Sequence, residues 1–229
     1  MRSFTGRVTE IQLDYGGIGS AWIDCPGGAL PAAGQYLLAR ATDAVEAPLA
    51  IPLFAREIAI ERFLTVAPIP PGWVPGTRLF LRGPLGRGFQ PPRAARRFAL
   101  VALGETVARL LPLVRPALEQ EAAITLFTDL PLPSLPASVE AYPLASFIET
   151  LPWADFLALD LSVDSLPALR QALGLAREAR LPCPAQALLI IGMPCGGMAE
   201  CGACAVLARR KWKLACKDGP VFPLDELEW

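Results

Sequence analysis

The chain contains 229 residues, of which 53% are hydrophobic and 19% are charged, and its formal net charge at pH 7 is −1. A chain of this length can bury a substantial core, and its near-neutral charge gives no support for nucleic acid or an anionic membrane as a partner. The sequence contains no histidine, which excludes a Rieske cluster, a Ser-His-Asp triad and a histidine-based zinc hydrolase.

The start of the chain lacks the apolar segment of a secretory signal peptide, and no apolar run approaches the ~18 residues that a membrane-spanning helix needs. We therefore expect no membrane association and a cytoplasmic location. Clustered thiols in that compartment indicate metal ligands rather than disulfides.

Residues 1–92 contain short strand-like runs that are separated by Gly and Pro and show no helical period. This pattern predicts a small antiparallel β-barrel as the first domain. The expected strands are 6–13, 20–24, 34–39, 56–66 and 77–82. Pro91 and Pro92 then form a stiff linker into the next domain.

Residues 93–192 show a different pattern, in which buried strands alternate with helices. Such alternation predicts a Rossmann-like α/β domain with a parallel sheet. The expected strands are 98–103, 123–128, 156–161 and 187–191, and the expected helices lie near 106–119 and 165–180.

The final segment, residues 193–229, contains four cysteines in the spacing C-x5-C-x2-C-x11-C. They are Cys195, Cys201, Cys204 and Cys216. Four thiolates suit a [2Fe–2S] cluster or a zinc ion. The first two gaps are close to the plant-type [2Fe–2S] spacing, and the small residues between them let backbone N–H groups approach the sulfides. We expect a small [2Fe–2S] cluster domain here, with structural zinc or unligated cysteines as alternatives, and ordinary core or loop positions for Cys25 and Cys183.

Five sequence segments carry a family resemblance. They are residues 193–197 (Met-Pro-Cys-Gly-Gly), 200–204 (Glu-Cys-Gly-Ala-Cys), 215–222 (Ala-Cys-Lys-Asp-Gly-Pro-Val-Phe), 34–36 (Gly-Gln-Tyr) and 83–89 (Gly-Pro-Leu-Gly-Arg-Gly-Phe). Together they resemble the electron-transfer (iron–sulfur) subunit of type B dihydroorotate dehydrogenase, which belongs to the ferredoxin-reductase-like superfamily. The resemblance implies a flavin-binding barrel, a nicotinamide-binding α/β domain and a C-terminal [2Fe–2S] domain.

The flavin motif of that family is an Arg-Pro-x-Ser segment, and Ala47 and Ala50 stand at its two functional positions here. A methyl group offers the flavin pyrophosphate neither a cation nor a hydrogen-bond donor. We therefore expect no tight binding of FAD, unless Arg40 or Arg56 binds the pyrophosphate in a rearranged pocket.

The nicotinamide motif of the family is a Gly-rich turn after the first strand of the α/β domain. The corresponding turn here contains Gly104 followed by Glu105. One glycine restricts the approach of the phosphates, and Glu105 adds negative charge where they should bind. As a structural residue, Glu105 would instead stabilise the dipole of a helix that begins there. We expect no tight nicotinamide binding.

The three lysines of the chain, Lys211, Lys213 and Lys217, all lie in the final segment, next to Arg209 and Arg210. Such cations could stabilise a reduced, anionic cluster and attract an acidic redox partner. The alternative is an ordinary solvated face of a hairpin.

Two hypotheses of function follow. In the first, the chain is a [2Fe–2S] electron-transfer subunit that relays electrons to or from a flavin-containing oxidoreductase partner in a hetero-oligomer, so that it is an accessory subunit rather than a catalyst alone. In the second, it is a non-catalytic adaptor whose tail is held together by zinc or a cluster.

Overall fold

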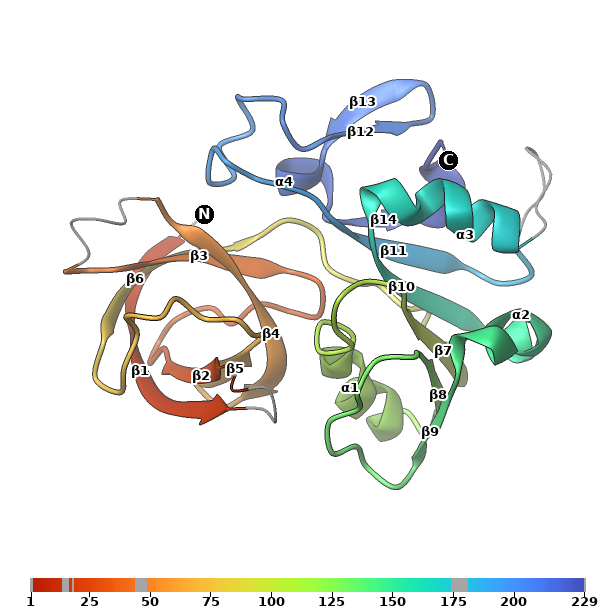
Figure 1. Cartoon of the computed structure of the whole chain (residues 1–229), viewed down its shortest axis with the longest axis horizontal. Coiled ribbons are helices and arrows are strands. Elements are labelled where there is room, and N and C mark those ends of the chain that lie inside the picture. The colour runs from red at the N-terminus through yellow and green to blue at the C-terminus, as the bar shows by residue number, and fades with distance from the viewer. Residues whose placement is uncertain (1, 14–16, 18, 44–48, 174–180, 229) are drawn as a thin grey trace.

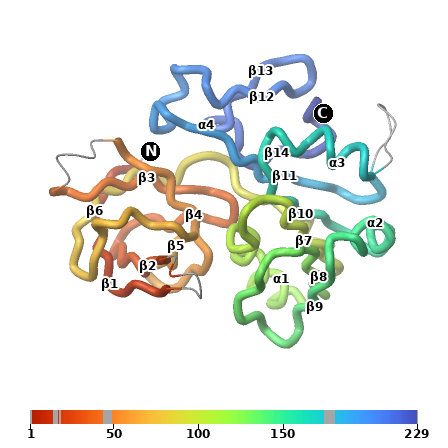
Figure 2. The backbone as a smooth tube through the Cα atoms, in the orientation of Figure 1, coloured from red at the N-terminus to blue at the C-terminus, as the bar shows by residue number. Residues whose placement is uncertain are grey.

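The computed structural model describes residues 2–13, 17, 19–43, 49–173 and 181–228. Three sheets organise this part of the chain: a closed barrel, a six-stranded sheet with helices on both faces, and a two-stranded hairpin (Figure 1). The barrel and the six-stranded sheet lie side by side, and the hairpin segment lies next to both (Figures 1 and 2). This architecture confirms the predicted combination of β-barrel, Rossmann-like α/β domain and small C-terminal cluster region.

Six antiparallel strands form the barrel, in the order β1-β2-β5-β4-β3-β6, and β1 closes it by pairing with β6. They are β1 (Arg2–Leu13), β2 (Gly19–Asp24), β3 (Tyr36–Ala41), β4 (Ile51–Ala59), β5 (Arg62–Thr65) and β6 (Arg78–Leu85). Apolar side chains fill the interior, and Leu37, Phe63 and Leu79 are completely buried there. The barrel therefore has its own hydrophobic core.

The predicted strand 56–66 is in fact two strands. β4 ends at Ala59 and β5 begins at Arg62, and Glu61 in the turn between them has a φ of 55°. Two-residue hairpin turns are usually recognised in a sequence by Asn-Gly or Asp-Gly. Ile60 and Glu61 carry no such signal, so the sequence pattern looks continuous.

The second sheet has the strand order β14-β11-β10-β7-β8-β9. Its strands are β7 (Arg97–Ala102), β8 (Ala123–Phe127), β9 (Val139–Tyr142), β10 (Phe156–Ser162), β11 (Ala185–Ile190) and β14 (Val221–Pro223). Five strands are parallel, as predicted, and β14 runs antiparallel to β11. The sequence pattern missed β9 and β14, because β9 has one buried residue in four and β14 is only three residues long.

Short helical elements cover both faces of this sheet (Figure 1). They are η1 (Leu111–Leu113), α1 (Val114–Glu119), η2 (Leu144–Ser146), α2 (Phe147–Thr150), η3 (Leu151–Trp153), η4 (Val163–Ser165) and α3 (Leu166–Ala172). Residues of α1 pack on one face, and residues of α2 and α3 pack on the other. None of the helices in the described ranges is long and apolar enough to cross a membrane.

Both predicted helices differ from the observed ones. The first was expected over 106–119, but the helical backbone begins at Leu111. Glu105 therefore does not lie in the first turn of a helix, and it cannot stabilise a helix dipole as the structural interpretation of this residue proposed. The second was expected over 165–180; α3 ends at Ala172, and residues 174–180 lie outside the described part of the chain.

The C-terminal segment returns to the second sheet after it has formed its hairpin. The hairpin consists of β12 (Ala205–Ala208) and β13 (Lys211–Leu214), and it is followed by α4 (Ala215–Asp218), β14 and η5 (Leu224–Glu226). Arg209 and Arg210 make the hairpin turn with φ values of 47° and 60°. Because β14 pairs with β11, the segment is anchored at both ends to one sheet edge (Figure 2).

Candidate metal centre

The four cysteines of the motif come from three local structures. Cys195 and Cys201 lie on the loop between β11 and β12, Cys204 directly precedes β12, and Cys216 lies in α4. The hairpin brings the last two together, because the N–H of Ala215 donates to the carbonyl of Cys204 at 2.9 Å. Cys204 and Cys216 are 1% and 3% exposed and belong to the sheet-domain core, whereas Cys201 is exposed. The site therefore extends from the hydrophobic core to the surface.

The thiols are arranged as two pairs. The thiols of Cys195 and Cys201 lie close enough to influence each other's protonation, and so do those of Cys204 and Cys216. Cys195 also interacts electrostatically with Cys216, so the two pairs are neighbours. Two adjacent thiol pairs suit a centre in which each of two irons takes two thiolates.

The loop between the first two cysteines supplies hydrogen-bond donors to sulfur. The Cys201 thiol and the backbone N–H groups of Met198, Glu200 and Cys201 lower the pKa of Cys195 to about 6, while partial burial opposes them. Gly196, Gly197, Ala199 and Gly202 all have φ values between 59° and 72°, which allows the backbone to wrap tightly. This geometry agrees with the expectation drawn from the small loop residues. The donor set therefore fits a [2Fe–2S] cluster.

In the buried pair, Cys204 and Cys216, the pKa shift has the opposite direction. Burial raises the pKa of Cys216 to about 12, and the contact in which the Cys216 thiol donates to Cys204, together with the charges of Cys204 and Cys195, acts in the same direction. A metal that binds this thiol must displace its proton. The two remaining cysteines of the chain lie elsewhere: Cys25 is in the barrel core, Cys183 packs at the edge of the sheet-domain core, and all six are free thiols.

Two barrel residues reach this site, and neither was predicted from the sequence to be a site residue. The Tyr36 hydroxyl, at the start of β3, donates to the carbonyl of Cys216 at 3.2 Å. The guanidinium of Arg82, in β6, donates to the carbonyl of Gly196. Tyr36 does lie in the Gly-Gln-Tyr segment noted in the sequence, but nothing in that segment indicates a partner 180 residues away.

The expected flavin positions are only partly covered by the structure. Ala50 is half-buried just before β4, whereas Ala47 lies outside the described residues. Downstream of Ala50, β4 packs against η1, and Phe54 of that strand contacts the core around α1. The barrel therefore meets the α/β domain through direct apolar contact beside the expected flavin motif.

The expected nicotinamide turn folds around a buried ion pair. Arg109 binds Asp160 with both ends of its guanidinium, Nε to Oδ2 at 2.8 Å and Nη2 to Oδ1 at 3.1 Å. The N–H groups of Leu103 and Gly104 donate to the carbonyl of Asp160 at 2.9 and 3.0 Å. A Cβ atom at Gly104 would lie 3.3 Å from Asp160 Oδ1. The donors of this turn are thus already bound to the main chain of Asp160, and the negative charge of Glu105 lies nearby.

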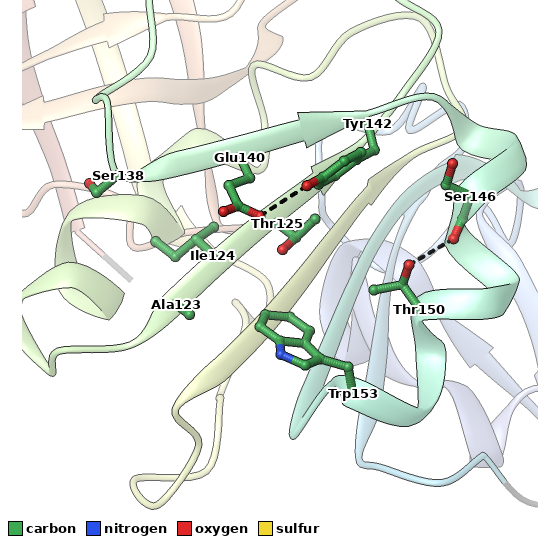
Figure 3. Close-up of a pocket in the computed structure, with 9 residues that line it drawn as sticks. All are labelled: Ala123, Ile124, Thr125, Ser138, Glu140, Tyr142, Ser146, Thr150 and Trp153. Atoms are coloured by element: carbon green, nitrogen blue, oxygen red, sulfur yellow. Dashed lines mark hydrogen bonds between the residues drawn. The ribbon is translucent and has the colours of Figure 1, made fainter.

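A separate hollow lies on the sheet-domain surface, far from the cysteines. This cavity of about 560 Å³ is formed by β8, β9 and the α2 region, and Thr125, Tyr142 and Trp153 are among its lining residues (Figure 3). Its polar groups bond to one another: Tyr142 donates to Glu140 at 3.3 Å and Thr150 to the Ser146 carbonyl at 2.9 Å. β9 is the sheet edge opposite β14, so this cavity is not part of the metal centre.

Comparisons with known proteins agree with this geometry. Residues 192–228 match the family described as the iron–sulfur cluster binding domain of dihydroorotate dehydrogenase B, and this match includes all four cysteines. No curated protein sequence matches the chain. Among solved structures, the chain is similar to an NADH-dependent reduced ferredoxin-NADP oxidoreductase, with a TM-score of 0.74 and 20% identity over 98% of this chain and 90% of that chain.

Two further structures are similar at lower scores. A ferredoxin NADP+ reductase from Neisseria gonorrhoeae, with bound FAD and NADP, has a TM-score of 0.59 and 11% identity over 82% of this chain and 99% of that chain. Phthalate dioxygenase reductase has a TM-score of 0.55 and 15% identity over 77% of this chain and 66% of that chain. At such identities the likeness establishes the fold.

The fold and the cysteine segment together define the class: the chain has a ferredoxin-reductase-like fold and carries an iron–sulfur cluster binding segment. More particularly, its residues 192–228 form an iron–sulfur cluster binding domain of the dihydroorotate dehydrogenase B family. The predicted resemblance to the electron-transfer subunit of that enzyme and the predicted [2Fe–2S] cofactor are confirmed, and the adaptor hypothesis is not favoured.

Proposed function

We propose that this chain is the relay subunit of a hetero-oligomer, which passes single electrons between a flavin-containing oxidoreductase subunit and a second carrier. The observation that carries the proposal is the arrangement of two adjacent thiol pairs, one buried and one reaching the surface. A [2Fe–2S] cluster, when bound, supplies one-electron redox chemistry. The ligands in this proposal are Cys195, Cys201, Cys204 and Cys216.

The protein's own residues would perform three tasks around such a centre. The buried pair, Cys204 and Cys216, excludes water on the core side. The loop around Cys195 directs N–H groups at sulfur and so stabilises negative charge there. The exposed Cys201 and Met198, whose side chain is 56% exposed, leave the outer side open to a partner. An electron can therefore cross at the surface without a substrate pocket.

We further propose the division of the chain at residues 92/93 and 192/193, which separates a barrel, an α/β domain and the cluster domain. The location proposed for the complex is the cytoplasm, where four clustered thiols stay reduced until they bind metal. The family match supports a dihydroorotate dehydrogenase type of partner over other flavoproteins.

The direct test is electron transfer between the isolated subunits. The chain, reconstituted with iron and sulfide, is mixed anaerobically with a reduced flavoprotein partner, and visible absorbance is followed in a stopped-flow instrument. We expect bleaching of the cluster bands that saturates at one electron per chain. A colourless protein that contains zinc would contradict the proposed relay and would restore the adaptor alternative.

We predict that the purified chain carries neither FAD nor a nicotinamide cofactor. Ala50 offers no charge-assisted contact, and the donors of the turn at Gly104 already bind Asp160. Each lost charge-assisted contact costs about 1.5–3 kcal/mol, so two losses weaken binding by several orders of magnitude. The measurement is flavin fluorescence after denaturation, together with calorimetric titration of NADH. Stoichiometric FAD in the protein as purified would contradict this prediction.

The exposed end of the hairpin offers a docking surface, here called the hairpin tip, made of Lys211 and Trp212, and Lys217 follows the hairpin in α4. Trp212 is 71% exposed, and the two lysines are exposed and form no ion pair with any described residue. By contrast, Lys213 pairs with Glu226 at 2.6 Å. Only part of the predicted basic group is therefore available to an acidic partner.

Reversal of one of these charges is expected to slow association with the flavoprotein. Lys211→Glu should reduce the second-order rate of electron transfer about 3- to 10-fold at low ionic strength and much less at high salt, with unchanged iron content. Arg7→Glu, an identical charge change on the exposed side of β1, is the matched control and should have little effect. Equal effects of both variants would place the docking site elsewhere.

A further inference from the structure

The barrel contributes two polar side chains to the loop that carries the cysteines. Tyr36 and Arg82 lie on β3 and β6, which are neighbouring strands, with Leu38 opposite Arg82 in their register. Both side chains donate to backbone carbonyls of the cysteine segment, to Cys216 and Gly196. The two partners belong to different segments of the site, because one is a ligand candidate in α4 and the other follows Cys195 in the loop.

Tyr36 is built into this contact. Its side chain is completely buried, and a buried phenol hydroxyl needs a partner, which the Cys216 carbonyl supplies at 3.2 Å. The ring is held by Phe54, with ring centroids 5.7 Å apart. On the other side, a Cβ atom at Gly197 would lie 3.0 Å from the Tyr36 hydroxyl, and Gly197 has a φ of 72°. The loop therefore approaches the phenol closely at a position that only glycine accepts readily.

Arg82 brings a positive charge to the same place. Its guanidinium binds a neutral carbonyl, and no carboxylate among the described residues pairs with it. The carbonyl belongs to Gly196, which directly follows the ligand candidate Cys195. A four-thiolate [2Fe–2S] centre is an anion that becomes more negative on reduction. A cation beside it favours the reduced form, and partial burial reduces the screening of that effect by water.

We propose that Tyr36 and Arg82 are positioning residues of the metal centre: the barrel holds the cysteine loop in place through both, and Arg82 raises the reduction potential of the bound cluster. The barrel thus serves the cluster directly, whether or not it binds a flavin. This role rests on the proposed assignment of the cluster to the four cysteines, and iron and sulfide content of the unsubstituted protein tests that assignment separately.

The charge effect is tested with variants of two arginines on one strand. Arg82→Gln is expected to shift the midpoint potential of the cluster to a more negative value, and Arg82→Lys, which keeps the charge, should shift it less. Arg78→Gln is the matched control, since Arg78 lies on the exposed side of β6, four residues away. Its potential should equal that of the unsubstituted protein. The readout is a redox titration followed by electron paramagnetic resonance.

The positioning effect is tested with an isosteric change. Tyr36→Phe removes only the hydroxyl, so the barrel should keep its far-ultraviolet circular dichroism, whereas iron loss to a chelator should become about five- to tenfold faster. The visible circular dichroism of the cluster should also change, because Cys216 is no longer held by its carbonyl. Tyr142→Phe, at the far sheet edge, is the control and should change neither quantity.

The outcomes distinguish a failure of the cluster assignment from a failure of the role proposed for the barrel residues. An unsubstituted protein without iron or sulfide would refute the cluster assignment itself. An intact cluster whose potential, spectra and chelator kinetics are unaffected by Arg82→Gln and Tyr36→Phe would overturn the barrel's role and leave the relay function standing. If Arg82→Gln fails to fold, Tyr36→Phe decides. Equal shifts in Arg78→Gln and Arg82→Gln would also overturn it, since they would reveal a general charge effect.

Discussion

Replacing Cys204 or Cys216 by serine is expected to abolish iron binding and to destabilise the C-terminal segment. Both side chains lie in the sheet-domain core with Val206, Phe222 and Leu224, so each substitution places a polar hydroxyl in that core and also removes a metal ligand. Loss of a structural metal site belongs to the mechanisms that cost more than about 4 kcal/mol. Iron analysis and thermal unfolding of the reconstituted proteins measure the two effects.

Substitutions in the outer pair, Cys195 and Cys201, should affect iron binding more than the stability of the metal-free protein. Cys201→Ser should also lower the iron content. Because Cys201 is exposed and Cys216 is buried, the metal-free Cys201→Ser protein should be more stable than the metal-free Cys216→Ser protein. Cys183→Ser is the control, because Cys183 lies outside the motif, and it should retain the full iron content. A protein that loses its colour on Cys183→Ser but keeps it on Cys195→Ser would refute the ligand assignment.

The fold was largely predictable because its main signals are local. Buried runs such as 98–103 and 123–128 specify central strands by their composition alone, and both strands were found. β14 gave no such signal, because three residues carry no period and their partner, β11, lies more than thirty positions upstream. The turn between β4 and β5 was missed for a related reason, namely that neither Ile60 nor Glu61 is a residue type typical of a hairpin turn.

The site was predictable only in its sequence-local part. Spacing identified the four cysteines, because ligand geometry limits how many residues can separate them. Tyr36 and Arg82 could not be found in this way, since their partnership with the loop depends on how the barrel packs against the cluster segment. The same holds for Asp160, which sits in the middle of an apolar strand and meets Arg109 through the turn after β7.

Removing one partner of that buried ion pair should strongly destabilise the fold, and Arg109→Met tests this. The side chain of Asp160 is 0% exposed and that of Arg109 is 11% exposed. Removing one partner leaves an uncompensated buried carboxylate, which costs about 3–5 kcal/mol of the free energy of unfolding. The control is Arg115→Met on the nearby helix α1, whose pair with Glu119 is 79% and 63% exposed and should matter by less than about 0.5 kcal/mol.

The pH dependence of that loss identifies its cause. Burial raises the pKa of Asp160, and Arg109 opposes this, so the pKa rises further when Arg109 is removed. A carboxyl group with a raised pKa in the folded state binds its proton more tightly there than in the unfolded chain, so the variant loses stability as pH rises through that range. Urea unfolding should be measured at neutral pH and at a pH between the pKa of Asp160 in the unfolded chain and its pKa in the folded variant. The loss of unfolding free energy in Arg109→Met should be smaller under the more acidic condition. A deficit independent of pH would mean that Arg109 contributes through packing rather than through charge.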